Sequence, residues 1–283
     1  MTKSGKITIA TCQITVGSNI SANARRIRKE IDAAGRRKAD IAHFPESALS
    51  GYAGADFKSW DDFDWDLLTE EMKALCRHVS KRKIWVIVGG AHHLSSGNLP
   101  HNSLYLISPD GGIADRYDKR FCTSVDLQYY TPGDHFGIFE IQGIRCGMLI
   151  CYDVRFPELY RQYKRRDVEV MFHSFYNARA RRAGILSEII PPTVRARAAS
   201  NYMWVSAANS SGHYQEWPSF LARPDGTVAA RLKRHRPGIT VNAIDTAQRF
   251  YDAAGVYRNR AMKGLLNSAP SVRDKRSRDR KSL

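Results

Sequence analysis

Short apolar runs alternate with amphipathic stretches along most of this chain, and this alternation constrains its fold more than any other feature. Three stretches, 20–34, 68–79 and 156–163, carry apolar side chains at the spacing of a helix with one buried face. Runs typical of strands lie around them, at 6–14, 39–44, 84–89, 102–108, 112–116, 136–141, 144–150, 168–174, 203–208, 219–223, 227–232 and 238–244. Helices that follow strands in both halves of the chain predict a layered α/β fold with mixed sheets.

Turn-forming residues refine this pattern. The sequence Pro-Asp-Gly-Gly at 109–112 separates two strand-like runs, and Gln142-Gly143 separates two others, so each pair is predicted to form a hairpin. A fourth helix is predicted to begin at Pro191-Pro192 and to run to about Asn201, because proline suits the first turn of a helix. No linker-like segment divides the chain, so we expect one domain over residues 1–270.

The charge balance is unusual, with 44 lysines and arginines against 28 aspartates and glutamates, a formal net charge of +16. The segment 271–283 holds six of these cations, two aspartates and almost no apolar side chains, so we expect a disordered basic tail there. The remaining cations are spread over short clusters typical of solvated helix faces, which leaves an anionic partner as the lesser alternative. No zinc-finger spacing, RNP-like aromatic motif or basic zipper accompanies them, so nucleic-acid binding is not expected.

Five cysteines, an odd number without CxxC spacing, fit free thiols in a reducing compartment better than disulfides or structural zinc. The first residues are too polar and their apolar run too short for a signal peptide, and no apolar run approaches the roughly 18 residues that a membrane helix needs. We therefore expect a cytoplasmic protein without a membrane segment.

Three residues with reactive side chains, Glu46, Lys119 and Cys151, each stand just beyond a predicted strand. The ends of strands are where α/β folds usually place active sites. Taken singly, each has an ordinary explanation: a glutamate that caps a turn, a solvated lysine, and a thiol that packs like a small apolar group. Their significance therefore depends on their occurring together.

The segments around these residues carry a recognisable pattern: Phe44-Pro45-Glu46 with Gly51-Tyr52, Tyr117-Asp118-Lys119, Tyr130-Thr131-Pro132-Gly133-Asp134, Cys146 to Glu158, Arg195-Ala196-Arg197-Ala198 and Ala207-Ala208-Asn209. Together they resemble the carbon–nitrogen hydrolase (nitrilase) superfamily, from about residue 6 to residue 245. The resemblance implies a four-layer α-β-β-α sandwich with two mixed β-sheets between helix layers. It also implies a homodimer or higher homo-oligomer.

The family's arrangement implies a role for each of these residues. Cys151 would attack the substrate, Glu46 would act as general acid and base, and Lys119 with the backbone N–H of Tyr152 would stabilise the oxyanion. Such an arrangement suits amides, which are poor electrophiles and benefit from a strong nucleophile and a covalent acyl-enzyme. A thiol with an ordinary pKa of ~8.5 needs a nearby base or cation to react at neutral pH. No metal or organic cofactor is implied.

Asp126 departs from the family's pattern. Many members carry a second, supporting glutamate seven residues before the glycine that Gly133 matches, and here that place holds an aspartate. The carboxylate is retained on a side chain one methylene shorter, so its contact with Lys119 or with substrate is expected to require a shifted loop.

The residues after the nucleophile favour one branch of the family. Cys151-Tyr152-Asp153 is similar to amidases and carbamoylases, whereas nitrilases tend to carry tryptophan and glutamate there. We therefore expect a small amide or N-carbamoyl compound as substrate, with nitrile hydrolysis as the alternative. Arg155 is a candidate for binding a substrate carboxylate, and a structural ion pair with Asp153 or Glu158 is the alternative.

Further substrate-contact candidates are Tyr52, Tyr176 and Asn177, each of which could instead serve loop structure or packing. Histidine-based activation of the thiol is a competing idea, with a base among His43, His92, His93 and His173. A different class of function is a catalytically idle family member that binds partners through its basic surface.

Overall fold

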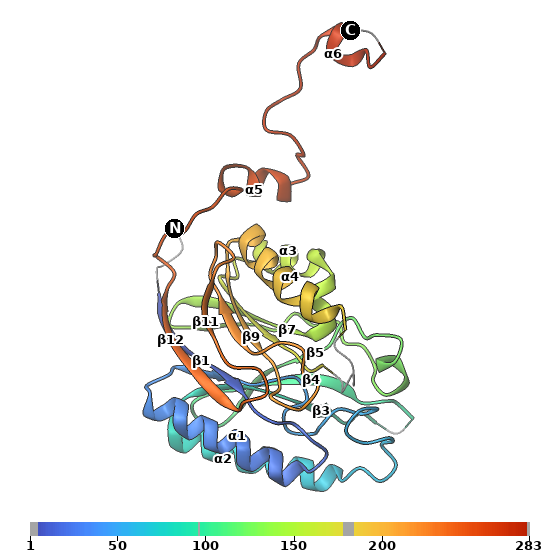
Figure 1. Cartoon of the computed structure of the whole chain (residues 1–283), viewed down its shortest axis with the longest axis vertical. Coiled ribbons are helices and arrows are strands. Elements are labelled where there is room, and N and C mark those ends of the chain that lie inside the picture. Colours follow the sequence, from blue (N-terminus) through green and yellow to red (C-terminus); the bar gives the residue numbers. More distant parts are fainter. Residues whose placement is uncertain (1–4, 96, 178–183, 282–283) are drawn as a thin grey trace.

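Two six-stranded sheets packed face to face form the centre of the molecule (Figure 1). The computed structural model describes residues 5–95, 97–177 and 184–281. The first sheet has the order β12-β1-β2-β3-β4-β5, with β1 at Lys6–Gln13, β2 at Ile41–His43, β3 at Trp85–His92, β4 at His101–Ile107, β5 at Ile113–Asp118 and β12 at Gly238–Asp245. The second has the order β11-β10-β9-β8-β7-β6, with β6 at Ile138–Ile141, β7 at Ile144–Ile150, β8 at Val170–Ser174, β9 at Trp204–Ala208, β10 at Phe220–Ala222 and β11 at Val228–Arg231.

Helices cover the outer face of each sheet (Figure 1). The first sheet is covered by α1 and α2 and the second by α3 and α4, with bounds Ile20–Arg36, Trp65–Arg82, Pro157–Lys164 and Leu186–Asn201. The apolar side chains of the predicted stripe on α1 are at most 5% exposed: Ile20, Ala24, Ile27, Ile31 and Ala34. Burial of such stripes against the sheets is the main force holding the layers together. The predicted four-layer α-β-β-α architecture is confirmed.

Both predicted hairpins are present, as the antiparallel pairs β4–β5 and β6–β7. Gln142 and Gly143 join the second pair, with φ of 51° and 79°, the left-handed values that a tight two-residue hairpin turn requires. The pair β1–β2 in the first sheet and the pair β7–β8 in the second are parallel, so each sheet mixes both directions, as predicted. Side chains from both sheets, such as Ile9, Ile87 and Phe172, meet in one fully buried core.

The start of α4 differs from the prediction. The helix begins at Leu186, so Pro191 and Pro192 lie inside it rather than in its first turn. The first turn is stabilised from a distance, because the Ser187 N–H donates to the Glu216 carboxylate at 2.8 Å. That partner is 29 residues away in the chain. The positions of the prolines do not predict where α4 starts, because the group that stabilises its first turn lies far away in the sequence.

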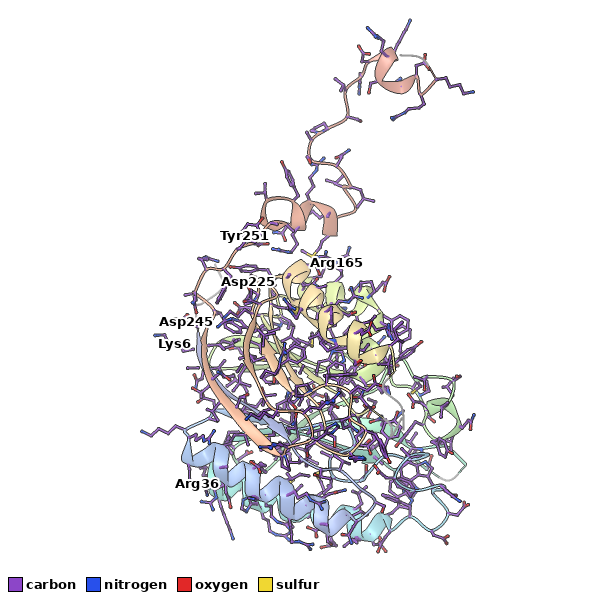
Figure 2. The ribbon with its side chains drawn as sticks, viewed as in Figure 1. Lys6, Arg36, Arg165, Asp225, Asp245 and Tyr251 are labelled. Carbon is purple, nitrogen blue, oxygen red and sulfur yellow. The ribbon has the colours of Figure 1, made fainter. Side chains whose placement is uncertain are left out.

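The last strand, β12, returns the chain to the first sheet and pairs antiparallel with β1 along its length. Lys6 and Asp245 lie opposite one another in this pairing, 3.8 Å apart between the ammonium and a carboxylate oxygen (Figure 2). Beyond β12 the chain leaves the sandwich and carries α5, Gly255–Met262, and α6, Lys275–Arg278 (Figure 1). Arg258 fastens α5 by donating to the Ser200 carbonyl oxygen at 3.0 Å. None of the helices in the described ranges is long and apolar enough to span a membrane.

Candidate active site

Glu46 is fully buried and follows β2, in a segment held against β3. The N–H of Leu49 donates to the carbonyl oxygen of Gly89 at 2.9 Å. A Cβ atom at Gly89 would stand 2.5 Å from both the Pro45 oxygen and the Ser47 nitrogen, so only glycine permits this approach. The backbone around Glu46 is therefore fixed by contact with a neighbouring strand.

Lys119 follows β5, and its side chain is fully buried. Its Nζ lies 3.0 Å from Glu46 Oε1 and 3.4 Å from the Tyr52 hydroxyl. Asn102 of β4 supports both charged groups, because its side chain donates to Glu46 Oε1 at 2.8 Å and its carbonyl accepts the Lys119 N–H at 2.8 Å. Gly133 reinforces the segment through its N–H, which donates to the Lys119 carbonyl oxygen at 2.9 Å.

Asp126 completes the charged cluster despite its shorter side chain. Its Oδ2 lies 2.8 Å from Lys119 Nζ, and its Oδ1 accepts a hydrogen bond from the Tyr52 hydroxyl. The carboxylate also accepts the Thr123 N–H at 2.9 Å, while the Thr123 hydroxyl accepts the Asp126 N–H at 3.0 Å. A 3₁₀ turn at Asp126–Gln128 thus brings the aspartate to Lys119. The two side chains are in contact although that of Asp126 is one methylene shorter than a glutamate.

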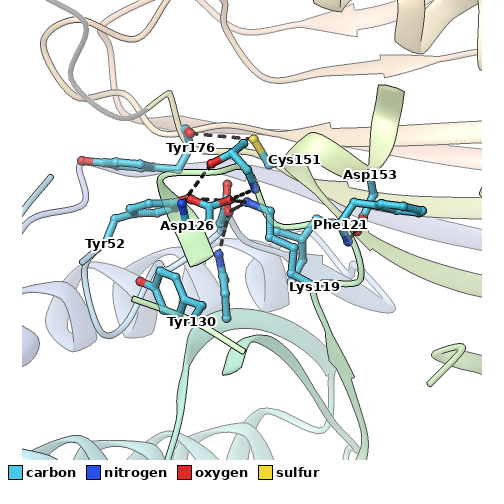
Figure 3. A network of polar contacts seen from close by, with 12 residues as sticks. Tyr52, Lys119, Phe121, Asp126, Tyr130, Cys151, Asp153 and Tyr176 are labelled. Carbon is cyan, nitrogen blue, oxygen red and sulfur yellow. Dashed lines mark hydrogen bonds and ion pairs between the residues drawn. The ribbon is translucent and has the colours of Figure 1, made fainter. Parts of the chain in front are cut away.

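Cys151 stands where β7 passes into a 3₁₀ turn, η2, at Cys151–Arg155. Its φ is +41°, a left-handed value that is rare for a residue with a side chain. The Sγ atom lies 3.9 Å from the Tyr176 carbonyl oxygen, in the same cluster as Lys119, Asp126 and Tyr52 (Figure 3). Such backbone strain persists only where the surrounding structure holds the residue in place.

The charges of the cluster form a consistent set. Burial alone would lower the pKa of Lys119, but nearby acidic groups, Glu46 first, outweigh it and raise that pKa well above its usual range. For Asp126 burial would raise the pKa, but the charge and hydrogen bond of Lys119 hold it below its usual range. Lys119 and Asp126 are therefore an ionised pair.

The pKa values of Glu46 and Cys151 are raised, whereas that of Asp126 is lowered. Burial raises the pKa of Glu46 against the opposing charge of Lys119. Burial and the charge of Glu46 raise the pKa of the Cys151 thiol well above its ordinary value. Cys151 is therefore a thiol at neutral pH, and its proton has to be removed by a base as it reacts.

Asp153 anchors the turn that carries Cys151. Its carboxylate accepts the Ile150 N–H at 3.0 Å, the Phe121 N–H at 3.0 Å and the Tyr117 hydroxyl at 2.7 Å. Burial raises the pKa of this carboxyl to about 6. Asp153 thus links the turn that carries Cys151 to the segment that follows Lys119 (Figure 3).

The predicted substrate-contact residues fall into two groups. Tyr52 and Tyr176 stack with ring centres 5.4 Å apart beside Cys151, so both belong to the cluster. Asn177 is buried in structural contacts, since its Oδ1 accepts a hydrogen bond from Asn209 at 2.9 Å. The side chain of Arg155 makes no ion pair within the described ranges, so the alternative pairing with its acidic neighbours is not seen. Their roles towards substrate stay predictions.

Tyr152 lies in the first turn of η2, where backbone N–H groups have no partner within the helix. Its predicted oxyanion role uses such a free N–H group and stays a prediction. Asn102 is the residue that the sequence reasoning missed. The available signal was the polar start of β4, His101-Asn102-Ser103, before its apolar remainder.

For His43 and His173, the histidine alternative finds no support in the geometry. Both ring nitrogens of His43 are engaged, with Ser206 and Ser174 at 2.9 Å each, and burial lowers its pKa to about 3. His173 is bonded to the Tyr160 hydroxyl at 2.7 Å, and burial lowers its pKa well below the usual value. Groups that hold protons so weakly in fixed hydrogen bonds are poor general bases.

Comparison with known proteins identifies the family. The model of the carbon–nitrogen hydrolase family matches residues 8–250. The chain therefore belongs to the carbon–nitrogen hydrolase family, which confirms both the predicted family and the predicted enzyme class.

Individual relatives and a solved structure agree with this membership. The chain is 24% identical to nitrilase homolog 2 of Dictyostelium discoideum over 79% of its own length and 71% of the relative's. It is 28% identical to 2-oxoglutaramate amidase of Bacillus subtilis (strain 168), over 74% and 79% of the two chains. A mutant of the amidase from Nesterenkonia sp. AN1, with the acetamide moiety of fluoroacetamide added covalently at its active-site cysteine, has the same fold. Its TM-score is 0.78 at 19% identity, covering 93% of this chain and 98% of that one.

Proposed function

We propose that this protein hydrolyses the C–N bond of a small amide or N-carbamoyl compound through a thioester on Cys151. One observation carries the proposal. Glu46 Oε1 is occupied by Lys119 and Asn102, whereas Glu46 Oε2 is buried and has no hydrogen-bond partner among the described residues. A buried, unpartnered carboxylate oxygen beside a thiol is costly to a structure and is what a general base requires.

The first half of the reaction forms the acyl-enzyme. The Cys151 sulfur attacks the carbonyl carbon while its proton passes to Glu46, and the carbonyl oxygen becomes an oxyanion. Lys119 and the N–H of Tyr152 stabilise this negative charge. The ionised Asp126 shares the positive charge of Lys119, so Lys119 is not paired with Glu46 alone. Glu46 then gives its proton to the nitrogen, the C–N bond breaks and ammonia leaves, so that a thioester remains.

The second half releases the acid. Glu46 removes a proton from water as the water oxygen attacks the thioester carbonyl carbon. The second tetrahedral intermediate expels the Cys151 sulfur, which regains its proton from Glu46. With an N-carbamoyl substrate the product acid is a carbamic acid, which breaks down to an amine and carbon dioxide.

Amides are preferred over nitriles for two reasons. Relatives similar to this chain include an amidase that acts on 2-oxoglutaramate and is similar across most of both chains. The turn after Cys151 also has Asp153, whose carboxylate accepts three hydrogen bonds there, in place of the residue typical of nitrilases. Both observations support a carboxamide or ureido group at the reacting carbon.

The test is ammonia release from a panel of carboxamides, N-carbamoyl compounds and nitriles. Wild type should release ammonia from at least one carboxamide or N-carbamoyl compound, and Cys151→Ala should release none. Cys76→Ala, a half-buried cysteine on α2, is the matched control and should behave like wild type. Mass spectrometry should find the acyl adduct on Cys151. If wild type released no ammonia from the whole panel, the proposal would be contradicted. If it released ammonia from nitriles alone, the substrate class would be nitriles instead of amides or N-carbamoyl compounds.

A further inference from the structure

A chain of buried hydrogen bonds crosses from the first sheet to the second behind the site. It consists of four polar side chains, each at most 1% exposed: Thr11 of β1, His43 of β2, Ser174 of β8 and Ser206 of β9. The imidazole stands in the middle, 2.9 Å from the Ser206 hydroxyl through Nδ1 and 2.9 Å from the Ser174 hydroxyl through Nε2. Polar groups this deeply buried are costly unless every donor and acceptor is satisfied.

The proton order along this chain follows from one fixed end. The Ser174 hydroxyl donates to the Phe44 carbonyl oxygen at 2.8 Å, so it accepts from His43, whose Nε2 carries the proton. His43 Nδ1 is then an acceptor, and the Ser206 hydroxyl donates to it. Thr11 in turn donates to the Ser206 oxygen at 2.8 Å. A neutral imidazole with one donor and one acceptor is what this order needs.

The Nε2 end of the imidazole reaches both halves of the candidate site through Ser174. Phe44, which accepts from Ser174, lies two residues before Glu46 on the first sheet. Ser174 is the register partner of Ile150, the residue before Cys151, on the second sheet. It also lies two residues before Tyr176, whose carbonyl oxygen is the contact of the Cys151 thiol. Base and nucleophile come from different sheets, and this bridge joins them.

We propose that His43 is a positioning residue that sets the separation between Glu46 and Cys151 across the two sheets. The role rests on the proposed function of those two residues. An apolar side chain at this place would leave the Ser206 hydroxyl without its acceptor and the Ser174 oxygen without its donor, and it would remove the direct side-chain link from β2 to β8 and β9. Small displacements of reacting groups cost large factors in rate.

Two substitutions at one position test the role. His43→Gln keeps one acceptor and donors on a planar amide, whereas His43→Leu fills similar space and keeps neither. We expect His43→Leu to lower kcat for the best substrate at least about tenfold with KM within about twofold, and His43→Gln to stay within about threefold of wild type. Thr193→Val removes a hydroxyl that donates to the Ile189 carbonyl oxygen within α4, outside the bridge, and is the control, with kcat within about twofold of wild type.

A second readout needs no substrate. The rate at which iodoacetamide alkylates Cys151, followed by peptide mass spectrometry, depends on the base that Glu46 supplies, and His43→Leu should slow it about tenfold. Should wild type hydrolyse nothing, this rate alone decides, so failure of the proposed function and failure of the positioning role are separate results. If His43→Leu does not fold, Ser174→Ala, which cuts the link to Phe44, takes its place with the same expected loss. Equal alkylation rates in wild type and the folded variant would overturn the proposal, as would an Nδ1–H tautomer of His43 by nitrogen NMR.

Discussion

The carboxylate of Asp126 lies 2.8 Å from the ammonium of Lys119, closer than the 3.0 Å that separates Lys119 from Glu46. Lys119 therefore divides its charge between two carboxylates instead of neutralising one. Asp126 has a pKa held below the usual range by Lys119, whereas burial raises that of Glu46. The ion pair with Asp126 leaves Glu46 free to exchange protons.

Removing the charge of Asp126 should therefore weaken the base. We expect Asp126→Asn to lower kcat about tenfold to a hundredfold, because Lys119 would pair with Glu46 alone and stabilise its ionised form. The acid limb of the pH–rate profile should move to lower pH for the same reason. The exposed Asp61→Asn is the control and should leave both quantities unchanged. An unaltered kcat and acid limb in Asp126→Asn would show that this ion pair does not govern Glu46.

The pH dependence of wild type follows from the raised pKa of Glu46. The base has to be ionised to accept the thiol proton, so kcat/KM should rise with pH, with an acid limb above the ordinary glutamate value of 4.5. Glu46→Gln should lower kcat about 10²- to 10⁴-fold and abolish that limb. Rates measured from pH 4 to pH 9 check both points. A limb at or below the ordinary value would contradict the desolvated base.

The contact between Gly89 and the Glu46 segment gives a steric prediction. An added methyl group at Gly89 would stand 2.5 Å from backbone atoms on either side of Glu46, whereas at Gly90 the nearest atoms are 3.9 Å away. Gly89→Ala should lower the free energy of unfolding by about 1–3 kcal/mol and reduce kcat, because the backbone around Glu46 has to move. Gly90→Ala should change both much less. Denaturant titrations and rates on the two variants provide the comparison.

Asp153 predicts a pH dependence of stability. Its folded pKa of about 6 exceeds the ordinary 3.8, so the folded protein binds this proton more tightly than the unfolded chain does. The resulting contribution is fully present below about pH 4 and is lost as pH rises through about 6, a change of about 3 kcal/mol. In Asp153→Asn this loss should disappear. The free energy of unfolding of wild type should therefore fall relative to that of the variant between pH 4 and pH 6, and parallel curves would refute the assignment.

The sequence was sufficient for features set by local periodicity. The stripe on α1, the strand ending at Ile150 and the hairpin at Gln142-Gly143 all depend on neighbours within a few residues. The order of Glu46, Lys119 and Cys151 along the chain also indicated the family, because each residue brings its own flanking motif.

Features set by contacts between distant segments could not be predicted in this way. The start of α4 depends on Glu216, and the position of Glu46 depends on the missing side chain of Gly89. The bridge joins His43 to Ser174, 131 positions along the chain, and to Ser206, 163 positions along the chain. A histidine in an apolar strand looks the same in the sequence whether or not such partners exist. The contact of Asp126 with Lys119 depends on a turn that Thr123 holds. The length of the aspartate side chain alone does not predict that turn.

The pairing of β12 with β1 has a consequence for the order in which the protein can be made. The second sheet uses one continuous stretch of chain, from Ile138 to Arg231, but the first lacks an edge strand until residues 238–245 are available. On a ribosome, β1 would wait with its edge uncovered while the entire second sheet is synthesised, and exposed edges invite wrong pairing. Completion of the sheet whose strands precede Glu46 and Lys119 is thereby postponed until β12 has emerged.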